Sequence, residues 1–290
     1  MSFGPKPWKQ QHWDARAATN FTAGGIGGGL VVVNALLALG GAPSAVALVI
    51  GMAVMALGLT TVWFEIGRPL RAMNVYINLR QSWMTREAYV AGATFALGAL
   101  AWWTGAVALF VAAGATAAVF VYCQARMLRR SVGIPAWREP SLVRFILATS
   151  LVEGLALGLI LHLVMTGGAA AAPAWGLALA LATAARYLAW TRYRARVEAA
   201  LVPAARRAIA GAHSLAWIYG TVVPIVLAGS AAWPAYQTIP LAVAALLALA
   251  TGARIKWIVL TRADYNQGFG LPHLPVRGVR MTVQGGGNER

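Results

Sequence analysis

Long apolar stretches recur along the whole of this 290-residue chain, with short polar segments between them. Each stretch holds about 20 residues, enough for a helix to cross a hydrocarbon core about 30 Å thick. Only helices and closed barrels satisfy their backbone groups in lipid, and these stretches are too long and continuous for barrel strands. The pattern predicts an all-α integral membrane bundle of eight transmembrane helices, at residues 20–39, 44–64, 88–104, 106–123, 142–165, 174–193, 209–232 and 239–260.

The eight predicted spans form one membrane domain, residues 20–260, between an N-terminal segment (1–19) and a C-terminal tail (261–290). Hydrophobic residues make up 59% of the chain and charged residues 11%, against about 25% charged in soluble domains, which argues against a soluble globule. The N-terminal segment lacks a short apolar core with a cleavage site, so it is not expected to be a signal peptide. Cys123 is the only cysteine, so an iron–sulfur cluster held by this chain alone, which takes four ligands, is excluded.

Glycine is concentrated in the first predicted span. Because small residues let helices approach closely in membranes, we expect this span to pack tightly against its neighbours. The glycines in question are Gly24, Gly25, Gly27, Gly28 and Gly29. No comparable interruption is evident inside the other seven spans.

Charge alternates along the connections between the predicted spans. The turns near residues 40–43, 103–105, 167–173 and 233–240 hold no charged residue, whereas the other three connections are rich in arginine. We therefore expect all 24 Lys and Arg residues on one side of the membrane. The positive-inside rule then places both termini and the basic loops in the cytoplasm. It also explains the net charge of +16 without a nucleic-acid partner.

Among the eight acidic residues, one is predicted to lie deep in the membrane. Glu153 follows the inner boundary of the fifth span by a distance equivalent to roughly 16 Å of helix. An ionised carboxylate there costs about 2.5–3.5 kcal/mol, so it should be protonated, paired or beside a wet cavity. Arg186 on the sixth span is the candidate partner. The two residues fit either a proton relay or a structural ion pair.

The segment between the second and third spans is the other candidate site. Thr85 is expected to cap the third helix, with Glu87 in its first turn, near the positive end of the dipole. A quinone site needs polar groups for the ring oxygens, a titratable group and an apolar slot open to lipid. Alternatively, the arginines are topology signals and the glutamates their counter-ions. The candidate quinone-binding or proton-transfer residues are Glu65, Arg68, Arg71, Trp83, Arg86 and Glu87.

Two histidines, His162 and His213, fall inside predicted spans and raise the question of a haem. Their positions place them about 24 Å apart along the membrane normal. That separation is too large for two axial ligands of one haem, and their spacing matches no metal motif. We therefore expect no haem and no metal site in this chain.

Two stretches of the candidate loop carry a family resemblance. Residues 65–72 (EIGRPLRA) and 82–87 (SWMTRE) resemble, in order and spacing, the signature His-Leu-Gly-x-Pro … Ser-Trp-Leu-Ser-Arg-Glu of the dimethyl sulfoxide reductase membrane anchor family. Members of this family have eight spanning helices, exchange electrons with the quinone pool and bind no haem. Glu87 matches the acidic residue that the family uses at its quinol site. Glu65 stands where the family has a functional histidine, which puts the proton-handling role of this position in doubt.

The resemblance implies a role in anaerobic respiration at the bacterial inner membrane. This chain would anchor an iron–sulfur subunit and a catalytic subunit holding a molybdenum or tungsten pterin, and would react with ubiquinone or menaquinone. Residues 265–269 (YNQGF) and 272–278 (PHLPVRG) also resemble the anchor subunits of phenylacetyl-CoA:acceptor oxidoreductases. That similarity implies a cytoplasmic partner that oxidises a CoA thioester.

The sequence therefore predicts a quinone-reactive membrane subunit that catalyses nothing alone, because it owns no redox centre. Two other functions stay open. One is a transporter or channel, with Glu153 and Arg186 forming a site at the midplane. The other is a structural anchor that docks a soluble complex and has no quinone site.

Overall fold

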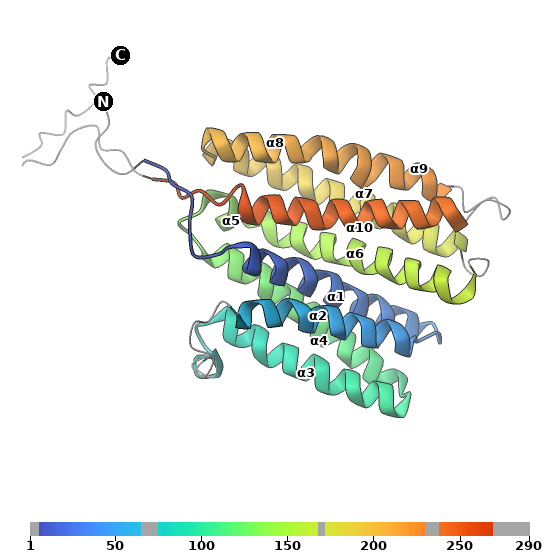
Figure 1. Cartoon of the computed structure of the whole chain (residues 1–290). Helices are drawn as coiled ribbons and strands as arrows, with labels where there is room; N and C mark the ends of the chain where they lie inside the picture. The colour runs from blue at the N-terminus through green and yellow to red at the C-terminus, as the bar shows by residue number, and fades with distance from the viewer. Residues whose placement is uncertain (1–5, 65–74, 168–171, 230–237, 269–290) are drawn as a thin grey trace, which may run out of the picture.

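The computed structural model describes residues 6–64, 75–167, 172–229 and 238–268, and within these ranges the regular structure is helical. The long helices run side by side along a common direction (Figure 1). An isolated β-bridge joins Lys9 to Tyr265. The helices are α1 (Ala15–Leu39), α2 (Ala45–Trp63), α3 (Trp83–Thr104), α4 (Val107–Arg130), the short α5 (Pro135–Arg138), α6 (Ser141–Thr166), α7 (Ala172–Val197), α8 (Pro203–Trp217), α9 (Val223–Gly229) and α10 (Thr238–Thr261).

Six helices in the described part of the chain are long and apolar enough to cross a membrane. They are α1, α2, α4, α6, α10 and the continuous stretch Pro203–Gly229 that contains α8 and α9. A π-helical turn, Ile218–Val222, joins α8 to α9, and a 3-10 turn, Glu198–Ala200, follows α7. The all-α, multi-pass membrane architecture expected from hydropathy is confirmed at this level.

Several helices extend beyond their apolar stretches at the end of the bundle where α1 begins. Helix α4 continues to Arg130 and α7 to Val197, since a helix needs no apolar residues once it leaves the hydrocarbon core. Helix α3 begins earlier than expected because Ser82, not Thr85, is its N-cap and accepts a hydrogen bond from the Thr85 amide at 3.2 Å. The expectation that Thr85 caps this helix is wrong, and Glu87 lies beyond the first turn.

Helix α1 packs against α2, α4, α6 and α10, and so joins the two halves of the bundle. A Cβ added at Gly29 would overlap the carbonyl oxygen of Ser150 on α6, and one at Gly154 would overlap the backbone of Gly29. The prediction that the glycines of the first span serve close packing is confirmed. Backbone-to-backbone contact of this kind is the usual way in which small residues hold membrane helices together.

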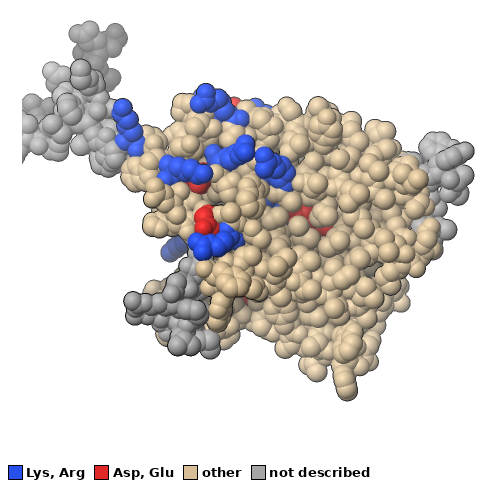
Figure 2. All heavy atoms as spheres, in the orientation of Figure 1, with Lys and Arg blue, Asp and Glu red and all other residues tan. Residues whose placement is uncertain are grey.

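Lysine and arginine side chains gather at the end of the bundle where α1 begins and α10 ends (Figure 2). Two basic residues of the predicted spans are buried instead of lying at the surface of this end. Arg186 is 2% exposed and Lys256 is 0% exposed, and both lie inside the helix bundle. Their helical positions turn them toward the protein interior, which the order of residues along the chain does not reveal.

Candidate functional site

Glu87 lies in a polar cluster between three helices, which we call the Glu87 cluster. The side chain is 4% exposed, and the amides of Asn20 on α1 and Gln124 on α4 are within hydrogen-bonding reach of it. Gln124 Nε2 also donates to the Asn20 carbonyl at 3.4 Å. Among the described residues, one oxygen of each of these three side chains has no hydrogen-bond partner. Buried acceptors without partners are rare and mark places that suit a donor or a ligand.

Trp83 lies one turn before Glu87 on α3, and two arginine side chains pack against its ring. The guanidinium carbons of Arg86 and Arg126 lie 4.4 and 4.6 Å from the centroid of its ring, both within cation–π range. Arg126 also donates to the Tyr122 hydroxyl at 2.7 Å, and Arg86 donates to the carbonyls of residues 79 and 80. Trp83 and Arg86 therefore contact each other, and Glu87 follows Trp83 by about one turn along α3.

Three of the predicted quinone-site residues fall in a segment that the structure does not describe. Glu65, Arg68 and Arg71 belong to residues 65–74, which lie outside the described residues. Sequence reasoning missed Asn20 and Gln124, the amides that face Glu87. The available signal was a polar amide residue at the edge of an apolar stretch.

A second cluster lies between α6, α7 and α10, and Glu153 is at its centre near the middle of α6. Glu153 Oε2 pairs with Lys256 Nζ at 2.5 Å, and both side chains are 0% exposed. Lys256 also donates to the α1 carbonyls of Phe21 at 3.4 Å and Thr22 at 3.3 Å. We call Glu153, Lys256 and Arg186 the buried charge cluster.

Arg186, the predicted partner of Glu153, binds backbone carbonyls instead of the Glu153 carboxylate. Its guanidinium donates to the Ala248 carbonyl at 2.7 Å and to the Gly220 carbonyl. It still acts on Glu153 electrostatically, and both side chains flank Gly252 on α10. The prediction of a direct Glu153–Arg186 pair is corrected to a Glu153–Lys256 pair with Arg186 nearby. The signal for this pair was Lys256, a lysine inside the last apolar stretch, which was counted among the charges that orient the chain in the membrane.

The π-helical turn at Ile218–Val222 explains how the Gly220 carbonyl can accept from Arg186. Pro224 stands four residues after Gly220 and has no N–H, so it cannot make the usual helical bond to that oxygen. The carbonyl is turned to the bundle interior instead, where Arg186 meets it. This interruption was not expected from the sequence. Single π turns inside helices are frequent at functional sites.

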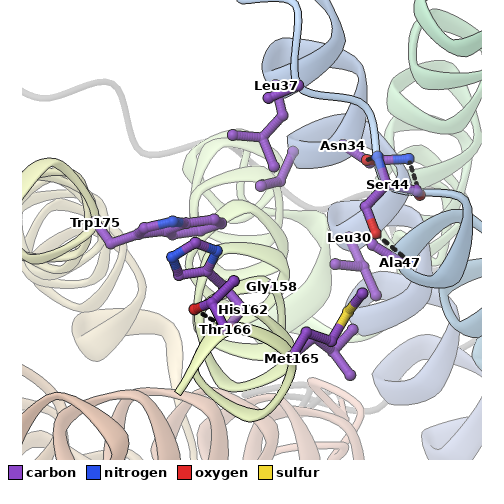
Figure 3. A pocket seen from close by; sticks show the side chains of 13 residues that line it. Leu30, Asn34, Leu37, Ser44, Ala47, Gly158, His162, Met165, Thr166 and Trp175 are labelled. Atoms are coloured by element: carbon purple, nitrogen blue, oxygen red, sulfur yellow. Dashed lines mark hydrogen bonds between the residues drawn. The ribbon is translucent and has the colours of Figure 1, made fainter. Parts of the chain in front are cut away.

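The two membrane histidines lie in separate surroundings. His213 on α8 stacks on Tyr187, with ring centroids 5.9 Å apart. The ring centroids of His162 and Trp175 lie 5.7 Å apart, beside a cavity of about 230 Å³ (Figure 3). This cavity is at the end of the bundle where α1 and α6 end, opposite Glu87. Among the residues that the structure describes, no group of three or more His, Cys, Asp or Glu could hold a metal ion.

The cavity beside His162 offers mainly apolar walls to a ligand. Asn34 and Ser44 line it but bond to each other, with the Asn34 amide donating to the Ser44 carbonyl at 2.9 Å and the Ser44 amide donating back at 2.8 Å (Figure 3). Along α1, Asn34 is fourteen residues from Asn20, about 21 Å of helix. The cavity is therefore distinct from the Glu87 cluster.

The chain matches no protein-family model, and a search of curated proteins also finds no match.

Proposed function

We propose that this chain is the membrane-anchoring, quinone-reactive subunit of a respiratory redox complex. The observation that carries the proposal is the Glu87 cluster: a buried carboxyl faced by the amides of Asn20 and Gln124, beside Trp83 and its arginines. A quinone takes up two electrons and two protons when it becomes a quinol. A carboxylic acid at one ring oxygen can supply a proton, while an amide N–H holds a ring oxygen in place.

The surroundings of the cluster suit a substrate that arrives from lipid. Met84 and Tyr89, on α3 beside Glu87, are 44% and 48% exposed, so this stretch of α3 presents apolar and aromatic side chains outward. Quinones are lipid-soluble and reach their sites sideways through the bilayer. A polar site within a helix bundle, close to one membrane surface, suits such a ligand better than a water-soluble one.

The eight-span topology belongs to the same proposal. Helices α3 and α7 have 22 and 26 residues, about 33 and 39 Å of helix, so both are long enough to span. Their hydropathy is lowered by buried polar residues such as Glu87 and Arg186, which face protein rather than lipid. The basic end and both termini would lie in the cytoplasm, with the chain in a bacterial inner membrane.

We take the partners from the family resemblance of residues 65–72 and 82–87. The basic end would dock an iron–sulfur subunit that connects the quinone to a catalytic subunit with a molybdenum or tungsten pterin. Residues 265–278 favour phenylacetyl-CoA as the catalytic substrate through their resemblance to other anchors. Because this chain supplies no redox centre in the proposal, its own part is to bind quinone, to position it near the partner's cluster and to move protons.

The test is electron transfer to a short-chain quinone in the complex purified through a tag on this chain. Glu87→Gln is expected to lower the rate about 100-fold, because the amide cannot give up a proton, while the partner subunits still co-purify. Glu198→Gln is the matched control, since Glu198 is an exposed glutamate paired with Arg194 at 3.6 Å, and it should keep the full rate. Full activity in Glu87→Gln refutes the site and leaves a structural anchor.

A transporter is the second candidate, and one observation favours it. The π turn before Pro224 interrupts an apolar helix next to the buried charge cluster, and transporters bind their substrates at broken helices near the midplane. Substrate or ion uptake by proteoliposomes of the purified chain, without any redox partner, supports this candidate.

A further inference from the structure

The Glu87 cluster and the buried charge cluster meet α1 at the same helical turn. The Asn20 carbonyl accepts from Gln124 of the first cluster at 3.4 Å. The next two carbonyls, those of Phe21 and Thr22, accept from Lys256 of the second at 3.4 and 3.3 Å. One turn of backbone therefore separates the amide that faces Glu87 from the ammonium group that pairs with Glu153.

Two neighbouring glycines make this close approach possible. A Cβ at Gly24 would lie 2.5 Å from Gln124 Nε2, and a Cβ at Gly25 would lie 2.5 Å from Lys256 Nζ and 2.6 Å from Ser150 Oγ. Any larger residue would push one cluster away from the helix. Ser150 Oγ and Glu153 Oε1 are buried and have no hydrogen-bond partner among the described residues, so polar atoms remain beside Lys256.

The charges of the two clusters balance each other when all four of their ionisable groups are charged. Within the described helices, the buried ionisable groups of these clusters are the acids Glu87 and Glu153 and the bases Arg186 and Lys256. With all four ionised, one cluster carries one negative charge and the other one positive charge. If one proton moves from Lys256 to Glu87, each cluster becomes neutral. Neither state leaves a net charge in the low-dielectric interior, where an unbalanced charge is expensive.

We propose that Lys256 is the internal proton donor that recharges Glu87 across α1, an inference that rests on the proposed quinone function. In the reaction, the quinone accepts two electrons from the partner's iron–sulfur cluster. The Glu87 carboxyl gives one proton to a ring oxygen, and water at the basic end gives the second. The Lys256 ammonium then passes its proton across α1 to the Glu87 carboxylate, and a proton from water at the basic end restores the ammonium before the next turnover.

Each member of the buried charge cluster has a defined part in this step. Glu153 on α6 and the two α1 carbonyls hold the nitrogen of Lys256 in place whether it carries two or three protons. Arg186 on α7 stays charged and balances Glu153 once Lys256 is neutral. Arg186 is itself fixed by the Ala248 and Gly220 carbonyls, so it does not need to move.

The experiment measures two quantities on the tagged complex: the dissociation constant of a short-chain quinone analogue and the rate of quinone reduction. Lys256→Met is expected to leave the dissociation constant unchanged and to slow reduction about 100-fold, because the donor is lost while Glu153 keeps Arg186. Thr183→Val is the matched control, since its buried hydroxyl donates to carbonyls of its own helix, and it should keep the full rate.

A second variant separates proton transfer from a structural role. Lys256→Arg keeps the positive charge beside Glu153, but a guanidinium does not release its proton, so this variant should also be slow, even if Lys256→Met fails to assemble. A full rate in Lys256→Arg or Lys256→Met overturns the relay. If Glu87→Gln is slow while both Lys256 variants are fast, the quinone site stands and only the relay fails. If Glu87→Gln is fast, the proposed function fails as well.

Discussion

Replacing Gly29 by alanine tests how the two halves of the bundle are held together. An added Cβ would overlap the Ser150 carbonyl oxygen and lie 2.8 Å from its carbon, against 3.4 Å for an ordinary contact. The difference means that α1 and α6 must part by at least about 0.6 Å, and a gap of about 0.5–1 Å forfeits a quarter to a half of each dispersion contact. Overpacking of this kind costs about 1–3 kcal/mol.

The assay is thermal or denaturant unfolding of the purified chain in one detergent, followed by its helical circular dichroism. Gly29→Ala is expected to lower the free energy of unfolding by about 2 kcal/mol. Gly92→Ala on α3 is the control, because a Cβ there meets nothing within 4 Å, and it should be neutral or slightly stabilising. Equal stability of the two variants, within about 0.5 kcal/mol, would refute the close packing of α1 on α6.

Two further predictions concern buried charges. Glu153→Gln leaves Lys256 and Arg186 as two unbalanced cations and should lower the free energy of unfolding by about 3–5 kcal/mol. Lys256→Met should lower it by less, because Glu153 still has Arg186 as a counter-charge. Equal losses of stability in the same unfolding assay would contradict a three-member cluster. Outside the spans, burial raises the pKa of Asp264. Its neutral form favours the folded state, so this contribution is present at low pH and is lost as pH rises through the raised pKa. Asp264→Asn should flatten that dependence in unfolding measured from pH 4 to 8, and an unchanged slope would contradict it.

Hydropathy and the glycine pattern were sufficient to predict the helical membrane architecture and the close packing of α1. A continuous apolar stretch of about 20 residues admits few structures in lipid, and glycines at close helical spacing have one common use there. The position of Glu153 near the middle of its helix was predicted from the number of residues between it and the start of its apolar stretch. These features depend on local composition, which can be read from a single sequence.

Helix rotation and helix pairing could not be predicted in the same way. Lys256 lies close to the predicted end of its span, where a long side chain could equally well reach the membrane surface. Only the packing of α10 against α6 turns it toward Glu153. The grouping of Asn20 and Gln124 with Glu87 likewise depends on which helices are neighbours. The π turn before Pro224 was missed because hydropathy does not register a change of helical hydrogen bonding.

The most direct test of the central claim is photolabelling of the purified complex with an azido-quinone, followed by mass-spectrometric mapping of the labelled peptides. The Glu87 cluster predicts labels on α3, α4 and the first turns of α1, and their loss when an excess of unmodified quinone competes. Labels confined to the cavity beside His162 and Trp175, at the opposite end of the bundle, would contradict a quinone site at Glu87.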